Sequence, residues 1–177
     1  MPVWDAFVRV THWAVAILVL IELVNEAGAN PWHRYLGYAA AALVIARLAW
    51  GLVTSGEARL ARMAATAAEA PAYLRSPRAY LGHNPLGALM AFLLWMLILA
   101  LGVTGWMTQL DAYWGEEWLQ WLHEGLAYVL AGCALLHIGG VLVTSRLYRV
   151  NLVAAMLSGK KRLPGRLTGS RGERAPR

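Results

Sequence analysis

The sequence predicts an all-α integral membrane protein, a four-helix bundle with both termini in the cytoplasm. Of its 177 residues, 59% are hydrophobic and only 15% are charged, and the mean hydropathy is +0.46. Four apolar runs each approach the roughly 20 residues that a helix needs to cross a bilayer. Lys and Arg are concentrated on one side of these runs, which orients the bundle. Membrane lipid is therefore the expected environment, and no nucleic-acid partner is expected.

The expected spans form a single domain, residues 1–158, and they lie at 7–24, 35–53, 85–107 and 119–145. The first run also resembles a signal peptide, because the small residues Ala27-Gly28-Ala29 follow a short apolar core. Two observations favour its retention as a span. Arg9 is the only cation near its start, and Glu22 interrupts its apolar core.

Three segments outside the spans are expected on the cytoplasmic side. Residues 54–83, rich in Ala and Arg, contain a candidate amphipathic surface helix at 57–69, with a solvated loop as the alternative. Residues 151–157 form a second candidate surface helix. The tail, 159–177, carries many cations among Gly and Pro and is predicted to be disordered.

The charges predict the topology. The loop between the first two spans has only Arg34 at its edge, and the loop between the last two has no Lys or Arg. Because cations remain on the cytoplasmic side, both termini and the middle loop are expected there. The outer side is acidic and carries Glu26, Asp111, Glu116, Glu117 and Glu124.

Four histidines sort into two pairs at two depths. His123 and His137 are fourteen positions apart in the last span, so they lie within about 40° of one face and about 21 Å apart along the axis. His12 begins an outward-running span and His33 begins an inward-running span. The orientation drawn from Lys and Arg therefore places His33 beside His123 near the outer surface, and His12 beside His137 near the cytoplasm.

Facing imidazoles in a helix bundle suit a six-coordinate haem b, which small residues such as Gly37, Gly132 and Gly139 would admit. The single cysteine, Cys133, excludes a C-x-x-C-H attachment site, so such a haem is held noncovalently. Zinc is the rival ligand, but it requires three or four donors where each level offers two histidines. In the remaining alternative the histidines only cross-link helices.

Several stretches of this sequence resemble the prokaryotic cytochrome b561 family, which includes the cytochrome b subunits of nickel-iron hydrogenases and stand-alone di-haem cytochromes. They cover all four spans in order: Val3-Trp4-Asp5, Thr11-His12-Trp13, His33-Arg34-Tyr35-Leu36-Gly37-Tyr38, Arg47-Leu48-Ala49-Trp50-Gly51, His83-Asn84-Pro85-Leu86-Gly87-Ala88 and Leu122-His123-Glu124 through His137. The resemblance implies two haems b, four histidine ligands at the positions above, and electron transfer between quinone and a periplasmic partner. The short chain lacks the extra helix expected of hydrogenase subunits.

Three further residues are candidate cofactor-binding groups. Arg34 lies beside the outer histidine and could hold a propionate of the outer haem. Arg47, fourteen residues after His33, repeats its face at the inner level, where it could pair with a propionate or extend to the cytoplasmic interface. His83 precedes the third span and could donate a hydrogen bond to a propionate or a quinone carbonyl, with a solvated loop histidine as the alternative.

The sequence thus predicts a multi-pass electron carrier of the bacterial inner membrane, linking the quinone pool to a periplasmic redox protein such as a c-type cytochrome. No catalytic residue is assigned. The alternatives are a superoxide oxidase that reduces quinone, a cytochrome b subunit of a hydrogenase-like complex, and a haemless membrane scaffold. The sequence leaves open whether the chain forms a homodimer.

Overall fold

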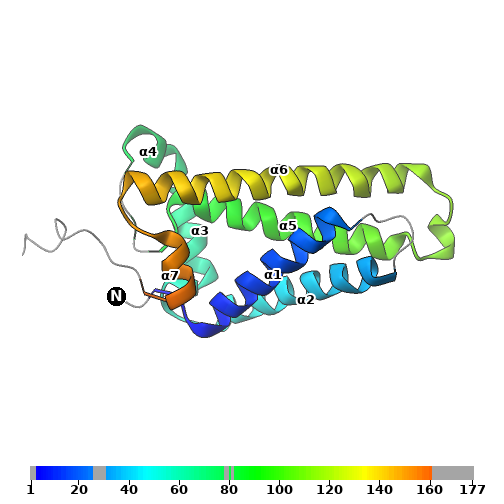
Figure 1. The fold of residues 1–177 in the computed structure, drawn as a ribbon, viewed down its shortest axis with the longest axis horizontal. Helices are drawn as coiled ribbons and strands as arrows, with labels where there is room; N and C mark the ends of the chain where they lie inside the picture. Colours follow the sequence, from blue (N-terminus) through cyan, green and yellow to red (C-terminus); the bar gives the residue numbers. More distant parts are fainter. Residues whose placement is uncertain (1–2, 26–30, 78–79, 81, 161–177) are drawn as a thin grey trace, which may run out of the picture.

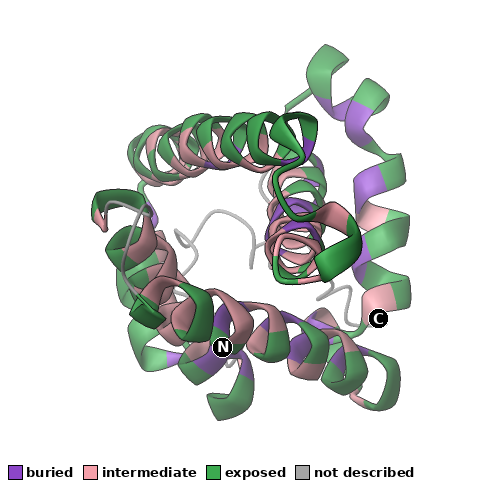
Figure 2. Ribbon diagram, turned by 90° about the vertical axis from the view of Figure 1, so that its right-hand side faces the viewer, coloured by how far each residue is buried: buried purple, intermediate pink, exposed green. Residues whose placement is uncertain are grey.

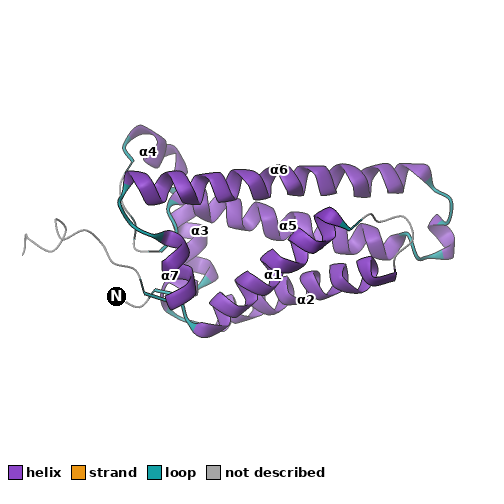
Figure 3. Cartoon of the chain, viewed as in Figure 1, coloured by secondary structure: helices purple, strands orange, loops and turns teal. Residues whose placement is uncertain are grey.

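Four long helices form the bundle in the computed structural model, which describes residues 3–25, 31–77, 80 and 82–160. They are α1 (Ala6–Val24), α2 (Pro31–Val53), α5 (Pro85–Met107) and α6 (Glu117–Leu147) (Figure 1). Each is long and apolar enough to cross a membrane. The described residues contain no β-strand (Figure 3), so the prediction of an all-α four-helix bundle is confirmed.

Side-chain caps mark where several helices begin. The Asp5 carboxylate accepts a hydrogen bond of 2.8 Å from the backbone N–H of Val8 at the start of α1. The Asn84 side chain accepts one of 2.6 Å from Gly87 N–H at the start of α5, where Pro85 occupies the first turn. These caps satisfy backbone donors that a helix leaves unpaired at its N-terminus.

The helices pack in chain order, α1 on α2, α2 on α5 and α5 on α6. A close approach of α2 and α5 requires Gly102, where a Cβ would lie 3.0 Å from the Cβ of Ala41. Within the described residues α6 packs closely on neither α1 nor α2, and it lies on the opposite side of the bundle from them (Figure 2). The buried core consists of Ala40, Val44, Leu97, Ile98 and Leu130.

The outward faces of the long helices are apolar. Leu135 and Leu136 of α6, for example, leave 71% and 67% of their surface exposed. Exposed residues lie along the outer sides of the bundle (Figure 2). Such extensive apolar exposure would favour association or aggregation in water, whereas lipid solvates it.

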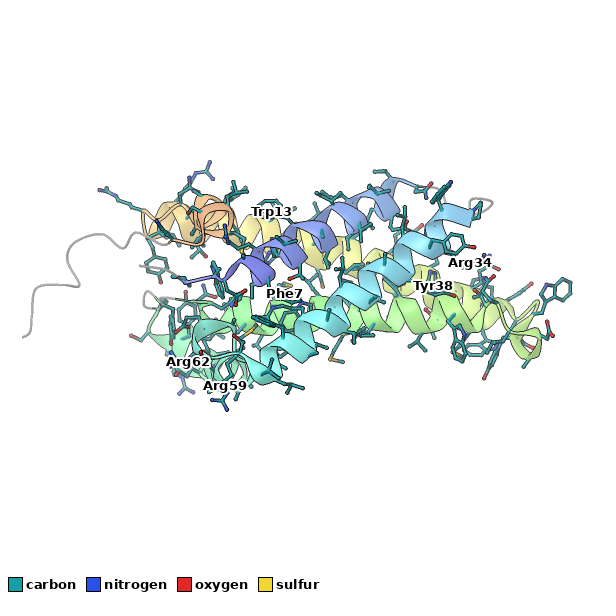
Figure 4. The ribbon with its side chains drawn as sticks, turned by 90° about the horizontal axis from the view of Figure 1, so that it is seen from below. Phe7, Trp13, Arg34, Tyr38, Arg59 and Arg62 are labelled. Carbon is teal, nitrogen blue, oxygen red and sulfur yellow. The ribbon has the colours of Figure 1, made fainter. Side chains whose placement is uncertain are left out.

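The short helices lie at one end of the bundle: α3 (Leu60–Ala68), α4 (Ala70–Arg75) and α7 (Leu152–Ser158). α3 buries Met63, which is 2% exposed, and packs against α5. Arg59 and Arg62 extend away from the bundle (Figure 4). An amphipathic helix therefore occupies part of the segment for which sequence left a helix and a loop open.

Both described ends of the chain meet at this same end, because Val3 N–H donates a hydrogen bond of 2.8 Å to Gly159 C=O. The opposite end holds the short 3-10 turn Asp111–Tyr113 and the start of α6. The expected disordered tail beyond residue 160 and the Ala27-Gly28-Ala29 segment both lie outside the described residues.

Candidate cofactor site

The structure brings the four histidines together in two facing pairs. The imidazole of His12 on α1 lies 6.3 Å, centroid to centroid, from that of His137 on α6. His33 on α2 lies 6.2 Å from His123, also on α6. One long helix therefore contributes an imidazole to each pair, and α1 and α2 contribute the others. This is the pairing expected from residue spacing and charge.

The spacing within each pair fits one metal ion ligated from both sides. Bonds from a metal ion to imidazole nitrogen are about 2 Å long, which separates the two ring centroids by roughly 6 Å. Among the described residues, no group of three or more His, Cys, Asp or Glu gathers as a metal site. Both pairs also bridge helices that do not pack closely on one another. A flat metal-containing group between α6 and the α1–α2 pair suits this arrangement better than zinc does.

The outer pair is oriented by a threonine that sequence reasoning missed. The hydroxyl of Thr104 on α5 donates to the backbone C=O of Ala100 at 2.9 Å and lies 2.8 Å from His123 Nδ1. With the hydroxyl proton directed to the backbone, the remaining interaction has Nδ1–H of His123 as donor. The lone pair of Nε2 is then free to bind a metal ion.

Gly105 makes room for this histidine ring. A Cβ at Gly105 would lie 3.2 Å from Cε1 of His123, so the ring packs directly against the α5 backbone. In sequence, Thr104 and Gly105 look like ordinary small residues of an apolar span. Only the packing of α5 against α6 assigns them to the outer pair.

The other outer histidine contacts a carboxylate. His33 Nδ1 on α2 lies in contact with Glu22 Oε2 near the end of α1, without the alignment of a hydrogen bond. A carboxylate beside Nδ1 favours the proton on that nitrogen and leaves Nε2 available as a ligand. The sequence showed Glu22 only as an interruption of the first span. In the structure it is part of the site.

The inner pair has a different environment. His12 Nδ1 is buried and has no hydrogen-bond partner among the described residues. Its ring contacts the Trp13 indole edge to face at 5.3 Å. An unpaired buried nitrogen is costly in a protein interior. Within the described residues, the inner pair therefore contains one buried nitrogen, His12 Nδ1, whose hydrogen-bonding capacity is not satisfied.

The glycines expected to admit the cofactor divide into two groups. Gly37 is four residues after His33, within about 40° of its face, and a Cβ there would meet no atom within 4 Å. Gly132 and Gly139 lie about 140° and 160° around α6 from His137. They face away from the histidines, so the lack of a side chain at these two positions does not create the space beside the imidazole pairs.

A comparison with known protein families decides the identity. The sequence model described as prokaryotic cytochrome b561 matches residues 3–159. The chain belongs to this family. No curated protein and no solved structure matches it. Members of the prokaryotic cytochrome b561 family transfer electrons across membranes by haem b, and this chain is a multi-pass membrane protein of that class. Its half-buried imidazole pairs fit haem b as the group that it binds.

Arg47 of this cytochrome is buried, with 5% of its surface exposed. Nη2 donates to Ala58 C=O at 3.1 Å and contacts Met63 Sδ at 3.7 Å. The guanidinium lies 5.3 Å from the centroid of Trp95. Its Nη1 is buried without a hydrogen-bond partner among the described residues. Arg47 therefore points into the end of the fold that holds the short helices rather than out of it, and its Nη1 remains available as a donor.

Arg34 and His83 mark opposite ends. Arg34 donates a 2.8 Å hydrogen bond to Gln109 Oε1, joining the start of α2 to the end of α5 beside the outer pair (Figure 4). The His83 ring contacts Trp4 at the other end, with centroids 4.8 Å apart and ring planes tilted by 60°. The neighbouring Asn84 donates to the hydroxyl of Tyr73 at 3.3 Å. Burial, followed by the hydrogen bond with Tyr148, raises the pKa of Tyr73 to about 12, so this group adds no charge near neutral pH.

Proposed function

We propose that the protein carries electrons across the bacterial inner membrane through two noncovalent haems b, each held by two histidines. His33 and His123 hold the outer haem, and His12 and His137 hold the inner haem. The observation that carries the proposal is the presence of two imidazole pairs, with centroids 6.2 and 6.3 Å apart, at two levels of one bundle. Haem b supplies a one-electron couple at each level.

The protein residues control the protons and the water around these couples. Thr104 and Glu22 hold protons on Nδ1 of His123 and His33, which keeps their Nε2 lone pairs available. The core around Leu130, seven residues from each α6 histidine, separates the two levels with apolar side chains and excludes water. The surrounding protein thereby also influences the potential of each couple.

Two arginines are assigned to the haem carboxylates in this proposal. Arg34 lies exposed beside the outer pair, and Nη1 of Arg47 is a buried donor at the inner end. Guanidinium groups bind carboxylates through charge-assisted hydrogen bonds. Both residues therefore orient the propionates or offset their charge.

The redox partners in this proposal are quinone on the inner side and a c-type cytochrome on the periplasmic side. Cationic residues, including Arg59, Arg62, Arg146 and Arg149, mark the end that holds the inner pair as cytoplasmic. Quinone then binds near that pair, where His83 is one candidate donor to a quinone carbonyl. Exposed Asp111, Glu116 and Glu117 lie at the other end beside the outer pair.

The test is the visible spectrum and haem content of the purified protein. We expect sharp absorption bands of reduced, six-coordinate haem b and a ratio of two haems per chain. Potentiometric titration of those bands should resolve two one-electron steps. A colourless, folded preparation would instead support the scaffold alternative, and a ratio of one haem per chain would contradict the pairing.

Substituting Thr104 with valine should weaken the outer haem selectively. The change removes the oxygen that accepts from His123 Nδ1–H, and loss of such a supporting interaction typically costs about 10- to 100-fold in metal affinity. Imidazole also becomes less basic, so the outer midpoint potential should rise. Redox titration with haem quantitation measures both effects.

Thr11→Val provides a matched control for this prediction. Thr11 is a buried threonine on α1 whose hydroxyl donates to the backbone C=O of Phe7 at 2.8 Å. Its removal should leave the outer potential unchanged. Equal shifts of the outer potential in both variants would show that Thr104 has no specific role at the outer haem.

A further inference from the structure

A pocket at the turn between α6 and α7 combines two arginines with apolar walls. It has a volume of about 510 Å³, and its walls include Leu142, Ser145, Arg146, Arg149, Asn151 and Val153. α6 and α7 meet at the end of the bundle that holds the short helices (Figure 1). No described Asp or Glu lines this α6–α7 pocket, so its charge is positive.

The two arginines of the pocket have no anionic partner in the described part of the chain. Arg146 and Arg149 are exposed. Among the residues that the structure describes, neither side chain forms an ion pair or a hydrogen bond. Two guanidinium groups beside one pocket repel each other, and an anion bound between them would offset that repulsion.

The turn after α6 holds Arg149 in a backbone conformation that usually belongs to glycine. Its φ is 51°. Val150 N–H donates to Ser145 C=O at 3.0 Å, and Arg149 N–H donates to Arg146 C=O at 3.3 Å. These two hydrogen bonds form a Schellman motif, in which Gly is usual at the position of Arg149 because a Cβ is unfavourable there. An arginine at this position costs conformational stability, and it adds a second guanidinium to the pocket of Arg146.

Neighbouring side chains fix the turn and supply further donors. Ser145 Oγ accepts a hydrogen bond of 3.3 Å from Leu152 N–H, and Asn151 Oδ1 accepts one of 2.8 Å from Ala154 N–H. Within the described residues, these bonds leave the Ser145 hydroxyl proton and the Asn151 amide protons without an acceptor. The polar side chains of the pocket therefore offer hydrogen-bond donors and positive charge.

Rotation along α6 places the pocket away from the imidazole pairs. Leu142 and Arg146 follow His137 on the same helix, about 140° and 180° around its axis. Arg146 is also about 14 Å further along that axis than His137. A haem carboxylate beside His137 therefore does not supply the anion of this pocket.

The apolar walls favour a phospholipid over a free anion. Leu142 lies one helical turn before Arg146, about 6 Å nearer the middle of the membrane. Ile138 and Leu135 are 48% and 71% exposed and continue this apolar stripe along α6. A phosphodiester beside the arginines would place its acyl chains along the stripe, whereas inorganic phosphate would leave the apolar walls in contact with water. Two cations without a described carboxylate also favour a lipid of net negative charge over a zwitterionic lipid.

We propose that the α6–α7 pocket binds an anionic phospholipid. Arg146 and Arg149 bind its phosphodiester group, and its acyl chains lie along α6 toward Leu135. The site goes beyond the electron-transfer function and does not depend on it, because it faces away from the imidazole pairs. The bound lipid offsets the repulsion between the two arginines and stabilises the turn that joins α6 to α7.

Native mass spectrometry of the purified full-length protein, titrated with phosphatidylglycerol in detergent, tests the site. We expect one tightly bound phosphatidylglycerol per chain and much weaker binding of phosphatidylcholine. Arg146→Ala and Arg149→Gly should each weaken binding about fivefold, which is the contribution of one cation near an anionic lipid. Added salt should weaken binding to the wild type, because it screens the attraction.

Arg149→Gly separates lipid binding from folding. Glycine adopts positive φ without steric cost, so this variant should melt at no lower a temperature than the wild type in lipid-free detergent. Arg59→Ala is the matched control. It removes an exposed arginine at the same end of the bundle whose side chain extends away from it (Figure 4), and it should leave lipid binding unchanged.

Three results would overturn the proposal. Equal weakening by Arg59→Ala would show a general attraction between the cationic end and anionic lipid rather than a pocket. Displacement of phosphatidylglycerol by millimolar inorganic phosphate would identify an anion site without selectivity for lipid. Phosphatidylcholine that binds as tightly as phosphatidylglycerol would exclude a role for the two charges. None of these measurements requires electron transfer, so the lipid site stands or fails separately from the haem proposal.

Discussion

Replacing His137 or His12 with alanine should remove the inner haem and leave the outer haem with its spectrum. His33→Ala or His123→Ala should do the reverse. Each variant deletes one of the two imidazoles whose centroids lie 6.3 Å apart in the inner pair or 6.2 Å apart in the outer pair. A six-coordinate haem that loses one axial ligand in a hydrophobic bundle is no longer held from both sides. Haem quantitation and low-temperature spectra measure the result. Each variant should contain about half the haem of the wild type.

His83→Ala is the control for these four variants. It removes the remaining histidine, whose ring contacts Trp4 rather than another imidazole. Both haems should remain. If His12→Ala and His33→Ala removed the same haem, the assignment of the two pairs to two separate haems would be wrong.

Reversing the charge of Glu116 and Glu117 to lysine should slow electron transfer to a basic cytochrome c at low salt. Both side chains are exposed at the start of α6, about two helical turns before His123, and Asp111 and Glu124 add to the same acidic surface. Fields of this kind change association rates by about 10- to 1,000-fold at low ionic strength. The rate at which a basic cytochrome c oxidises the outer haem, measured by stopped flow, should therefore fall at least about tenfold in the variant.

The dependence of the electron-transfer rate on salt shows whether the acidic surface attracts or repels the cytochrome c. Wild-type rates should fall as ionic strength rises, because salt screens an attraction. In the double variant the dependence should flatten or invert. Arg59→Glu, an exposed charge change at the opposite end of the bundle, should leave it unchanged (Figure 4). Fast, salt-insensitive reduction of the wild type by superoxide would favour the superoxide oxidase alternative, which the acidic outer surface otherwise disfavours.

Some of the features behind these predictions could be predicted from the sequence, and others could not. The pairing of His12 with His137 and of His33 with His123 was expected from spacing along helices and from the side on which Lys and Arg gather. Depth in a bilayer follows from rise per residue and from chain direction, and both are local properties. The family assignment was likewise expected from its motifs and is confirmed by the match over residues 3–159.

The sequence analysis did not predict which small residues of neighbouring helices lie beside the histidines. Gly132 and Gly139 were expected beside the cofactor because they are small, yet their spacing from His137 along α6 places them on another face of the helix. Gly105, equally small, packs against His123, where a Cβ would lie 3.2 Å from Cε1. Composition treats all three glycines alike. Spacing along α6 already separates Gly132 and Gly139 from His137, whereas only the packing of α5 against α6 brings Gly105 to His123.

Hydrophobicity, helical periodicity and the distribution of Lys and Arg therefore predicted the four spans, their direction and the levels of the four histidines, because each is read from short stretches of sequence. The tertiary structure alone decided which polar groups support them. Thr104 meets His123 from a different helix, Glu22 on α1 meets His33 on α2, and Arg9 meets Leu157 of α7 from 148 residues away. These contacts depend on how helices rotate and pack against one another, which the pattern of any single helix does not contain.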